Sequence, residues 1–195
     1  MDEVRETAMA YYKSSSTDLK ELGRGFFKNL DFDGDGKVSL HEFLGFMKEE
    51  GYAPMNNRYI FKELDGDGSD SLDFWEVLTL YYILKSGRPF CEGCGEFIKA
   101  LYFTCTTCFD SGSNPFCLCS TCYGDGKFIH NHGQFMDNYA LLEAKRKSSA
   151  SSMCNGDDSN SVKVKALITI TLKLYPTLHA DFDVIHGILF SIALS

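Results

Sequence analysis

The chain has 195 residues, of which 44% are hydrophobic and 24% are charged, proportions typical of a folded globular protein. Acidic residues outnumber basic ones by 27 to 19, which argues against a nucleic-acid-binding protein, because such proteins need a basic surface to neutralise phosphates. The longest uncharged apolar stretch, residues 184–195, is too short for a membrane span, which needs about 20 residues. With no apolar leader at the start, we expect a soluble cytoplasmic or nuclear protein.

The first half of the chain predicts two pairs of helices, each pair joined by an acidic segment. From apolar residues at helical spacing, three helices are expected at about residues 18–30, 40–50 and 74–84, and a further helix, third in chain order, is expected to carry Ile60, Phe61 and Leu64. Asp18 is the predicted N-cap of the first helix, and Asn56 or Asn57 that of the third. The segment 86–89, which contains a glycine and a proline, ends the fourth helix and marks a domain boundary. Residues 1–14 form an N-terminal segment to which the pattern assigns no element.

An internal repeat of 34 residues relates the two acidic segments, since it matches Asp31 to Asp65 and Glu42 to Glu76. The first copy, residues 31–42, satisfies the EF-hand calcium-loop pattern at every specified position. Calcium takes about six to eight oxygen ligands at ~2.3–2.6 Å, which a loop wound around the ion can supply. The predicted ligands of this first ion are Asp31, Asp33, Asp35, the carbonyl of Lys37, Ser39 and Glu42.

The second copy, residues 65–76, departs from this pattern at two positions. Ser69 replaces an acid but still offers a hydroxyl oxygen, and Asp70 stands where glycine is usual. Aspartate tolerates the left-handed backbone conformation better than most residues, so we expect this loop to bind calcium as well. Its predicted ligands are Asp65, Asp67, Ser69, Ser71, Asp73 and Glu76. The alternative interpretation of both copies is a solvated acidic turn between helices.

Residues 15–87, which carry both loops and their flanking helices, resemble a calmodulin-type EF-hand pair. Val38 and Leu72 occupy equivalent positions in the two loops, and we expect them to meet in a two-stranded contact. The resemblance implies a four-helix domain that binds two calcium ions.

All eight cysteines lie beyond residue 90, and six of them form three Cys-x-x-Cys pairs. The pairs are Cys91 with Cys94, Cys105 with Cys108, and Cys119 with Cys122. Together with His130 and His132 they provide enough ligands for two tetrahedral zinc sites. Disulfides are the alternative, which the absence of a secretory signal disfavours.

The order of these ligands over residues 88–142 resembles the ZZ-type zinc finger, in which the ligand pairs interleave. The resemblance implies that one zinc ion is held by Cys91, Cys94, Cys119 and Cys122. It implies that the second zinc ion is held by Cys105, Cys108, His130 and His132. It also implies a protein or peptide partner, although Cys117 stands where the family often has an aspartate. Cys117 is therefore an alternative ligand to Cys119.

Beyond the zinc-finger-like segment the sequence is less informative. Residues 143–161 are rich in serine and predict a linker. Apolar and polar residues alternate over residues 162–174, which predicts a strand. We assign no function to the tail, residues 162–195.

The expected fold class is mainly α, with a paired EF-hand four-helix domain, a small cross-braced zinc-binding α+β module and a C-terminal tail. Zinc sites closed by four protein ligands leave no open position for catalysis, and no nucleophile–base motif occurs, so we do not expect an enzyme. The predicted function is that of a calcium-responsive sensor or adaptor whose zinc module binds a protein. A calcium buffer with a structural zinc module and a ubiquitin-ligase-like enzyme are the alternatives.

Overall fold

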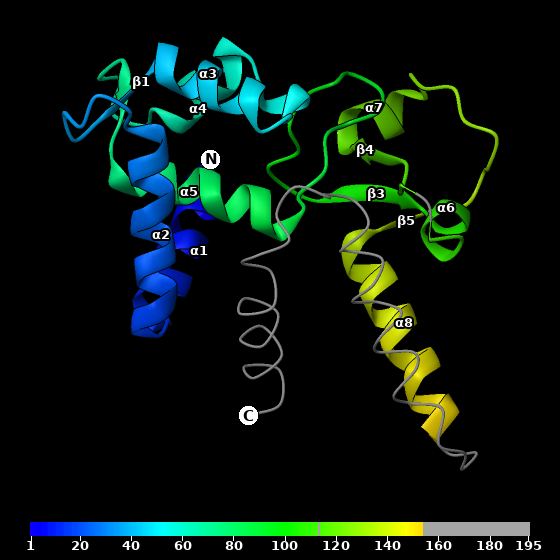
Figure 1. The fold of residues 1–195 in the computed structure, drawn as a ribbon. Coiled ribbons are helices and arrows are strands. Elements are labelled where there is room, and N and C mark those ends of the chain that lie inside the picture. Colours follow the sequence, from blue (N-terminus) through cyan, green and yellow to red (C-terminus); the bar gives the residue numbers. More distant parts are fainter. Residues whose placement is uncertain (113, 154–195) are drawn as a thin grey trace. The chain divides into compact units, whose positions relative to one another are not determined.

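The computed structural model describes residues 1–112 and 114–153, so the predicted tail strand and the last part of the predicted linker lie outside the described residues. The chain divides into two compact units (Figure 1). We call them the helical unit, Met1–Phe90 with Gly95–Lys99, and the cysteine unit, Cys91–Cys94 with the described residues between Ala100 and Met153.

The helical unit consists of α-helices, one turn of 3-10 helix (η1) and a two-stranded antiparallel sheet. In chain order the elements are α1 (Asp2–Ser14), α2 (Thr17–Leu30), β1 (Val38–Ser39), α3 (Leu40–Glu49), η1 (Ala53–Met55), α4 (Arg58–Leu64), β2 (Ser71–Leu72) and α5 (Phe74–Ser86). The prediction of a mainly helical first half is confirmed, and α2 to α5 follow the four predicted helices closely.

Local capping explains where most of these helices begin. The Asn57 side chain accepts a hydrogen bond from the Ile60 N–H at 2.9 Å, which caps α4. The predicted cap of α2 is wrong, because α2 begins earlier, with Ser16 at the N-cap position. Asp18 lies in the first turn instead, where a negative charge interacts favourably with the helix dipole.

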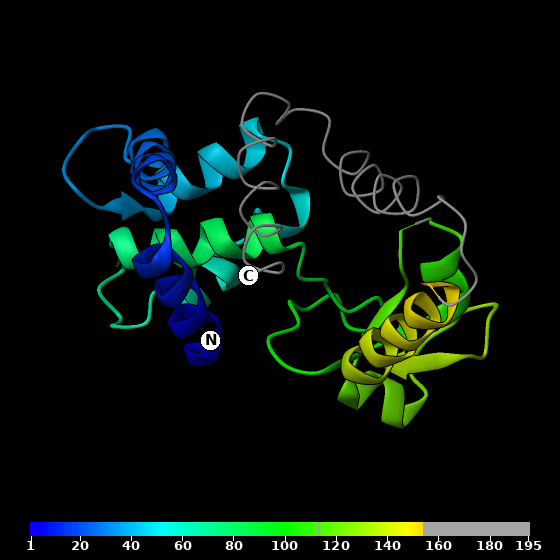
Figure 2. The same ribbon diagram turned by 90° about the horizontal axis from the view of Figure 1, so that it is seen from below.

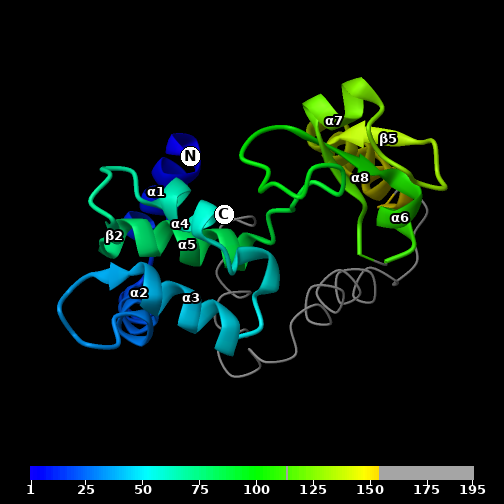
Figure 3. The ribbon, with the colours of Figure 1, turned by 90° about the horizontal axis from the view of Figure 1, so that it is seen from above.

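The two acidic loops meet through the short sheet, at the same end of the helical unit (Figure 3). Val38 pairs with Leu72 in antiparallel register, as predicted from the repeat, and both side chains are fully buried. The core below them is aliphatic and aromatic, and its most deeply buried side chains include Leu30, Phe43, Met47, Leu64 and Leu80. The paired loops are therefore fixed to the core by two buried side chains.

Residues 1–14, which carry no predicted element, form helix α1 and pack against α5 (Figure 1). Val4 and Ala8, one helical turn apart, are its buried side chains. Two apolar residues at this spacing are too weak a signal to stand out in the sequence. The helical unit therefore contains one helix more than the predicted four-helix pair.

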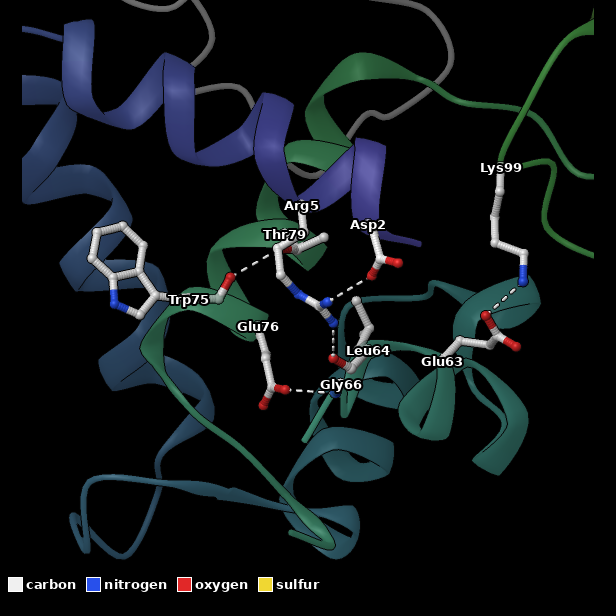
Figure 4. A network of polar contacts seen from close by, with 9 residues as sticks. All are labelled: Asp2, Arg5, Glu63, Leu64, Gly66, Trp75, Glu76, Thr79 and Lys99. Atoms are coloured by element: carbon white, nitrogen blue, oxygen red, sulfur yellow. Dashed lines mark hydrogen bonds and ion pairs between the residues drawn. The ribbon is translucent and has the colours of Figure 1, made fainter. Parts of the chain in front are cut away.

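The segment Gly95–Lys99 follows the first cysteine pair in sequence but belongs to the helical unit. Phe97 is only 6% exposed and forms part of the helical core. Its ring meets that of Phe90 edge to face, with centroids 5.6 Å apart. Lys99 donates a hydrogen bond to the Glu63 carboxylate on α4 at 2.6 Å (Figure 4). The Phe97 ring and this ion pair hold the segment to the helical unit, together with the buried side chain of Ile98 and the hydrogen bond from the Ile98 N–H to the Pro89 carbonyl oxygen at 3.1 Å.

Replacing Lys99 with methionine is expected to destabilise the chain in a pH-dependent way. The hydrogen bond from Lys99 lowers the pKa of Glu63 and raises that of Lys99 itself. Because the pKa of Glu63 is lower in the folded than in the unfolded chain, the ionised carboxylate stabilises the fold at pH values above the unfolded pKa. This stabilisation is lost as the pH falls through the folded pKa. For a partly exposed pair we expect a loss of about 0.5–1 kcal/mol at pH 7.

Urea unfolding over a pH series measures this effect, with Lys62→Met as the matched control, because Lys62 is an exposed lysine of the same region. The difference in the free energy of unfolding between Lys99→Met and the wild type should vanish at pH values where Glu63 is protonated. An equal loss of stability at acid and neutral pH would mean that Lys99 acts through its aliphatic chain rather than its charge.

The cysteine unit is built on a three-stranded antiparallel sheet of order β4-β3-β5. Its elements in chain order are β3 (Tyr102–Cys105), α6 (Thr106–Asp110), β4 (Cys117–Cys119), α7 (Ser120–Asp125), β5 (Phe135–Asp137) and α8 (Asn138–Met153). This agrees with the predicted small α+β module. Aromatic rings pack around the strands, including Phe103 stacked on Tyr123 with centroids 4.0 Å apart.

Helix α8 begins directly after β5, contacts β5 and β3, and then extends away from the sheet (Figures 1 and 2). It includes residues 143–153, the first part of the predicted linker. Asp137 caps it by accepting hydrogen bonds from the Tyr139 and Ala140 N–H groups, each at 3.0 Å. Leu141 is buried, so packing near the start of the helix fixes a segment whose composition is otherwise polar. None of the described helices is long and apolar enough to cross a membrane.

Candidate metal centres

Four groups of side chains bring three or four ligand atoms within 4.8 Å of one another in the described residues. Two groups contain only cysteine and histidine: Cys91, Cys94, Cys119 and Cys122 form the all-cysteine tetrad, and Cys105, Cys108, His130 and His132 form the mixed tetrad. Two groups contain only acids: Asp31, Asp33 and Glu42, and Asp65, Asp67 and Glu76. Each group combines residues that lie apart in the sequence.

The all-cysteine tetrad joins the turn at Cys91 and Cys94 to the junction of β4 and α7. Cys119 ends β4 and caps α7, where its sulfur accepts a hydrogen bond from the Cys122 N–H at 3.4 Å. The Cys91 sulfur accepts from the Cys119 N–H at 3.3 Å. Backbone N–H groups directed at sulfur stabilise thiolates, the form in which cysteine binds metals.

The thiols of this tetrad differ strongly in acidity. Burial alone raises the pKa of Cys91, but hydrogen bonds from the Cys119, Cys94 and Gly93 N–H groups lower it to about 6. Burial and hydrogen bonding with the three neighbouring thiols raise the pKa of Cys122 to about 12. Four sulfurs so close together cannot all ionise without a cation between them, so their chemistry fits a soft divalent metal.

Gly93 allows the turn that carries Cys91 and Cys94 to lie close to α7. A Cβ atom at Gly93 would lie 2.9 Å from the Cys122 Cβ and 3.1 Å from the Lys127 carbonyl oxygen. A side chain at this position would therefore push the turn that carries Cys91 and Cys94 away from α7.

The mixed tetrad is assembled from β3, α6 and the loop before β5. The Cys108 sulfur lies 3.3 Å from His130 Nε2 and 3.4 Å from His132 Nδ1. Those two ring nitrogens are 3.2 Å apart, and the Cys105 sulfur is 3.6 Å from His132 Nδ1. The His130 ring stacks on Phe116 with centroids 4.1 Å apart, which fixes its orientation.

The two tetrads interleave along the chain, as the resemblance to the ZZ-type zinc finger implies. The first and third cysteine pairs meet in one tetrad, and the second pair meets the histidines in the other. Cys117 belongs to neither group. Its side chain is buried, its sulfur lies 3.6 Å from the Thr104 hydroxyl oxygen, and burial raises its pKa. None of the seven described cysteines forms a disulfide. The donor sets are consistent with two zinc ions.

The first acidic group closes the loop between α2 and α3. Glu42 accepts hydrogen bonds from the Phe32 and Asp33 N–H groups at 2.9 and 3.2 Å, and from both the N–H and the hydroxyl of Ser39 at 2.7 Å. Burial alone would raise the pKa of Glu42, but these hydrogen bonds lower it. The ionised Glu42 carboxylate therefore lies beside the backbone at the start of the loop.

Asp31 shows most directly that this loop suits a cation. Its Oδ2 accepts a hydrogen bond from the Gly36 N–H at 3.1 Å, whereas its Oδ1 is buried and has no hydrogen-bond partner. A buried carboxylate oxygen without a partner is unfavourable unless a cation compensates it. The Asp35 carboxylate is not in the group; it accepts a hydrogen bond from the Lys37 N–H at 2.8 Å instead.

The second acidic group repeats this arrangement between α4 and α5. Glu76, 6% exposed, accepts a hydrogen bond from the Gly66 N–H at 2.6 Å (Figure 4). It accepts another from the Asp73 N–H at 3.0 Å. Burial raises the pKa of Glu76, so its charge is less well compensated than that of Glu42. Asp70 adopts the left-handed conformation, with φ 59°, as the sequence predicts for this position.

The remaining predicted ligands of the second loop have other partners in the structure. The Ser69 hydroxyl donates to the Ser71 carbonyl oxygen at 2.9 Å. Asp73 caps α5 by accepting from the Trp75 and Glu76 N–H groups at 2.8 and 2.9 Å. The Asp73 carboxylate is therefore not part of the acidic group.

One residue beside the second loop has no signal in the sequence. Arg5 of α1 donates a hydrogen bond to the Leu64 carbonyl oxygen at 3.0 Å and pairs with Asp2 at 3.2 Å (Figure 4). A Cβ atom on Gly66 would overlap the Arg5 guanidinium. Only the packing of α1 against α5 brings Arg5 to this position.

Comparisons with known proteins add no relative. No family model matches the chain, and no significant match was found among curated proteins or solved structures. The metal-ligating geometry therefore carries the functional argument.

Proposed function

We propose that this protein is a calcium-responsive adaptor: an EF-hand pair binds two calcium ions, and a ZZ-type module held by two zinc ions binds a protein partner. The observation that carries the calcium part is Asp31, whose buried Oδ1 has no hydrogen-bond partner beside two further carboxylates. Oxygen-rich loops of this kind suit calcium because it is a hard cation with a large coordination shell.

The first loop would hold its calcium ion through Asp31, Asp33 and Glu42, and the second through Asp65, Asp67 and Glu76. Bound calcium would supply positive charge to compensate these clustered carboxylates. Glu42 and Glu76 lie in the first turns of α3 and α5. A change in the partners of either carboxylate is therefore passed directly to the helix that carries it.

The adaptor part of this proposal rests on the two tetrads and the exposed side chains of the cysteine unit. Both tetrads are closed by four protein ligands, an arrangement typical of structural rather than catalytic zinc. The zinc ions would thus stabilise the strands and turns of the cysteine unit, whose exposed aromatic and apolar side chains include Phe109, Ile129 and Tyr139. Such side chains are suited to contact with a protein.

Native mass spectrometry combined with a dye that binds apolar surface tests this proposal. The full chain is expected to carry two zinc ions, and to take up two calcium ions when calcium is added. Calcium should also increase dye binding and change the fluorescence of Trp75, the sole tryptophan, which directly precedes Glu76.

Two outcomes would count against the adaptor. Calcium uptake without a change in dye binding would indicate a buffer instead. A chain that takes up no calcium at millimolar concentration would leave the acidic loops as solvated turns.

A further inference from the structure

Residues 88–99 form a hairpin whose two arms are joined to each other in the helical unit. Phe90 and Phe97 pair as an antiparallel bridge, and the Ile98 N–H donates to the Pro89 carbonyl oxygen at 3.1 Å. The Phe97 ring is part of the helical core, and the Phe90 ring packs against that core. The arms of this hairpin, which we call the core hairpin, are therefore anchored among the helices.

The tip of the core hairpin, Cys91–Cys94, belongs to the cysteine unit. Cys91 directly follows Phe90 in the chain, so a member of the all-cysteine tetrad is bonded to a residue that packs against the helical core. The Glu92 N–H donates to the Cys117 carbonyl oxygen at 2.9 Å, which fixes the tip to β4. The core hairpin is therefore held at its tip by the cysteine unit and along its arms by the helical unit.

The arms of the core hairpin contact both helices that flank the second loop. The Lys99 ammonium pairs with Glu63 at 2.6 Å (Figure 4) on α4, which ends one residue later, directly before the loop. The Arg88 guanidinium lies over the Tyr82 ring of α5, 5.9 Å from its centroid, and donates to the Lys99 carbonyl oxygen at 3.2 Å. Any rearrangement of α4 against α5 therefore acts on the arms that carry the tip.

The second acidic group and the all-cysteine tetrad are assembled in the same arrangement of the chain. The ligand atoms of each group lie within 4.8 Å of one another while the arms of the core hairpin are packed in the helical core. Two ions that favour the same arrangement strengthen each other's binding, and this coupling is reciprocal. Calcium in the second loop and zinc in the tetrad would therefore each stabilise the arrangement that the other ion requires.

We propose that calcium in the second loop and zinc in the all-cysteine tetrad strengthen each other's binding through the core hairpin. This regulation rests on the proposed function, since both ions must bind. It makes the calcium response depend on zinc, because the second loop reaches its full calcium affinity only when the tetrad is loaded. The mixed tetrad takes no part in this linkage, since none of its four members adjoins the core hairpin in the chain.

Calcium titration of the full chain carrying Cys122→Ala tests this linkage, because Cys122 belongs to the all-cysteine tetrad but lies outside the core hairpin. Cys117→Ala is the matched control, since Cys117 is a buried cysteine of the same unit outside both tetrads. Cys108→Ala removes a member of the mixed tetrad instead. Native mass spectrometry counts the zinc ions of each chain, and the fluorescence of Trp75, next to Glu76, measures calcium binding at the second loop.

We expect Cys122→Ala to bind calcium at the second loop about tenfold more weakly than the wild type, a typical size for coupling between two sites. Cys117→Ala should bind calcium like the wild type, and Cys108→Ala should lose much less affinity than Cys122→Ala. Reciprocally, saturating calcium should raise the zinc affinity of the all-cysteine tetrad in the wild type about tenfold. Competition with a zinc-chelating dye measures that affinity.

If Cys122→Ala does not fold, Lys99→Met provides the test, because it detaches the core hairpin from α4 without changing a metal ligand. It should reduce the effect of calcium on zinc affinity to about threefold or less, as the loss of one partly exposed ion pair allows, whereas Lys62→Met should leave this effect unchanged. Equal calcium affinities of Cys122→Ala and the wild type, or equal losses in Cys122→Ala and Cys108→Ala, would overturn the linkage alone. A chain that binds zinc but takes up no calcium would overturn the proposed function as well.

Discussion

Replacing Cys119 with alanine is expected to lower the zinc content from two ions to one and to loosen the packing of β4 and α7 in the cysteine unit. Cys119 belongs to the all-cysteine tetrad, ends β4 and caps α7, so its loss removes a metal ligand and a helix cap together. Structural zinc contributes an apparent binding free energy of about 10–16 kcal/mol, far more than a small unit gains from packing. Native mass spectrometry counts the zinc ions, and near-ultraviolet circular dichroism measures the loss of aromatic packing.

Cys117→Ala is the matched control, because Cys117 lies two residues earlier in the same strand but outside both tetrads. This variant should keep both zinc ions and lose about 1–2 kcal/mol of stability, as expected for a small change at a buried site. A chain that keeps two zinc ions with Cys119→Ala but loses one with Cys117→Ala would show that Cys117 is the ligand.

Replacing the final glutamate of each acidic loop is expected to weaken calcium binding at that loop. Glu42→Gln and Glu76→Gln each remove one charge and one of two carboxylate acceptors, while leaving the side-chain size unchanged. We expect roughly 10²-fold weaker binding, within the range that ligand charge produces in such loops. Isothermal titration calorimetry measures the affinity of each loop.

Two comparisons make this prediction specific. Glu49→Gln removes the same charge from an exposed position near the end of α3 and should leave calcium binding unchanged. Glu76→Gln should abolish the response of Trp75 to calcium, whereas Glu42→Gln should preserve most of it, since only Glu76 follows Trp75 in the chain. If all three variants bind calcium alike, the two glutamates are not ligands.

Much of the helical unit could be predicted because its signals are local or repeated. Helix boundaries follow from capping residues and apolar spacing, as for Asn57 and α4. The contact between Val38 and Leu72 follows from the repeat, since equivalent positions of two similar loops can pair. The ligand requirements of zinc predict that the cysteines and histidines meet in two tetrahedral sites, and the resemblance to the ZZ-type zinc finger implies which residues share each site.

The remaining features of the fold and of the candidate sites depend on contacts between distant residues, which no local sequence pattern predicts. Helix α1 is fixed by two small buried side chains and by Arg5, whose partner Leu64 lies 59 residues away. The unpartnered Oδ1 of Asp31 arises from burial, which spacing alone does not reveal. Cys117 and Cys119 offer the same chemistry in the sequence, and only the folded strand directs one sulfur into the tetrad and the other toward Thr104.

The return of Gly95–Lys99 to the helical unit limits how this polypeptide can be divided. The chain passes three times between the two units, so no single peptide bond separates them. A fragment ending within residues 86–89 lacks Phe97, a side chain of the helical core, and a fragment starting there carries that ring without its hydrophobic surroundings. Neither unit can therefore be transferred to another protein as one continuous segment without including residues of the other unit.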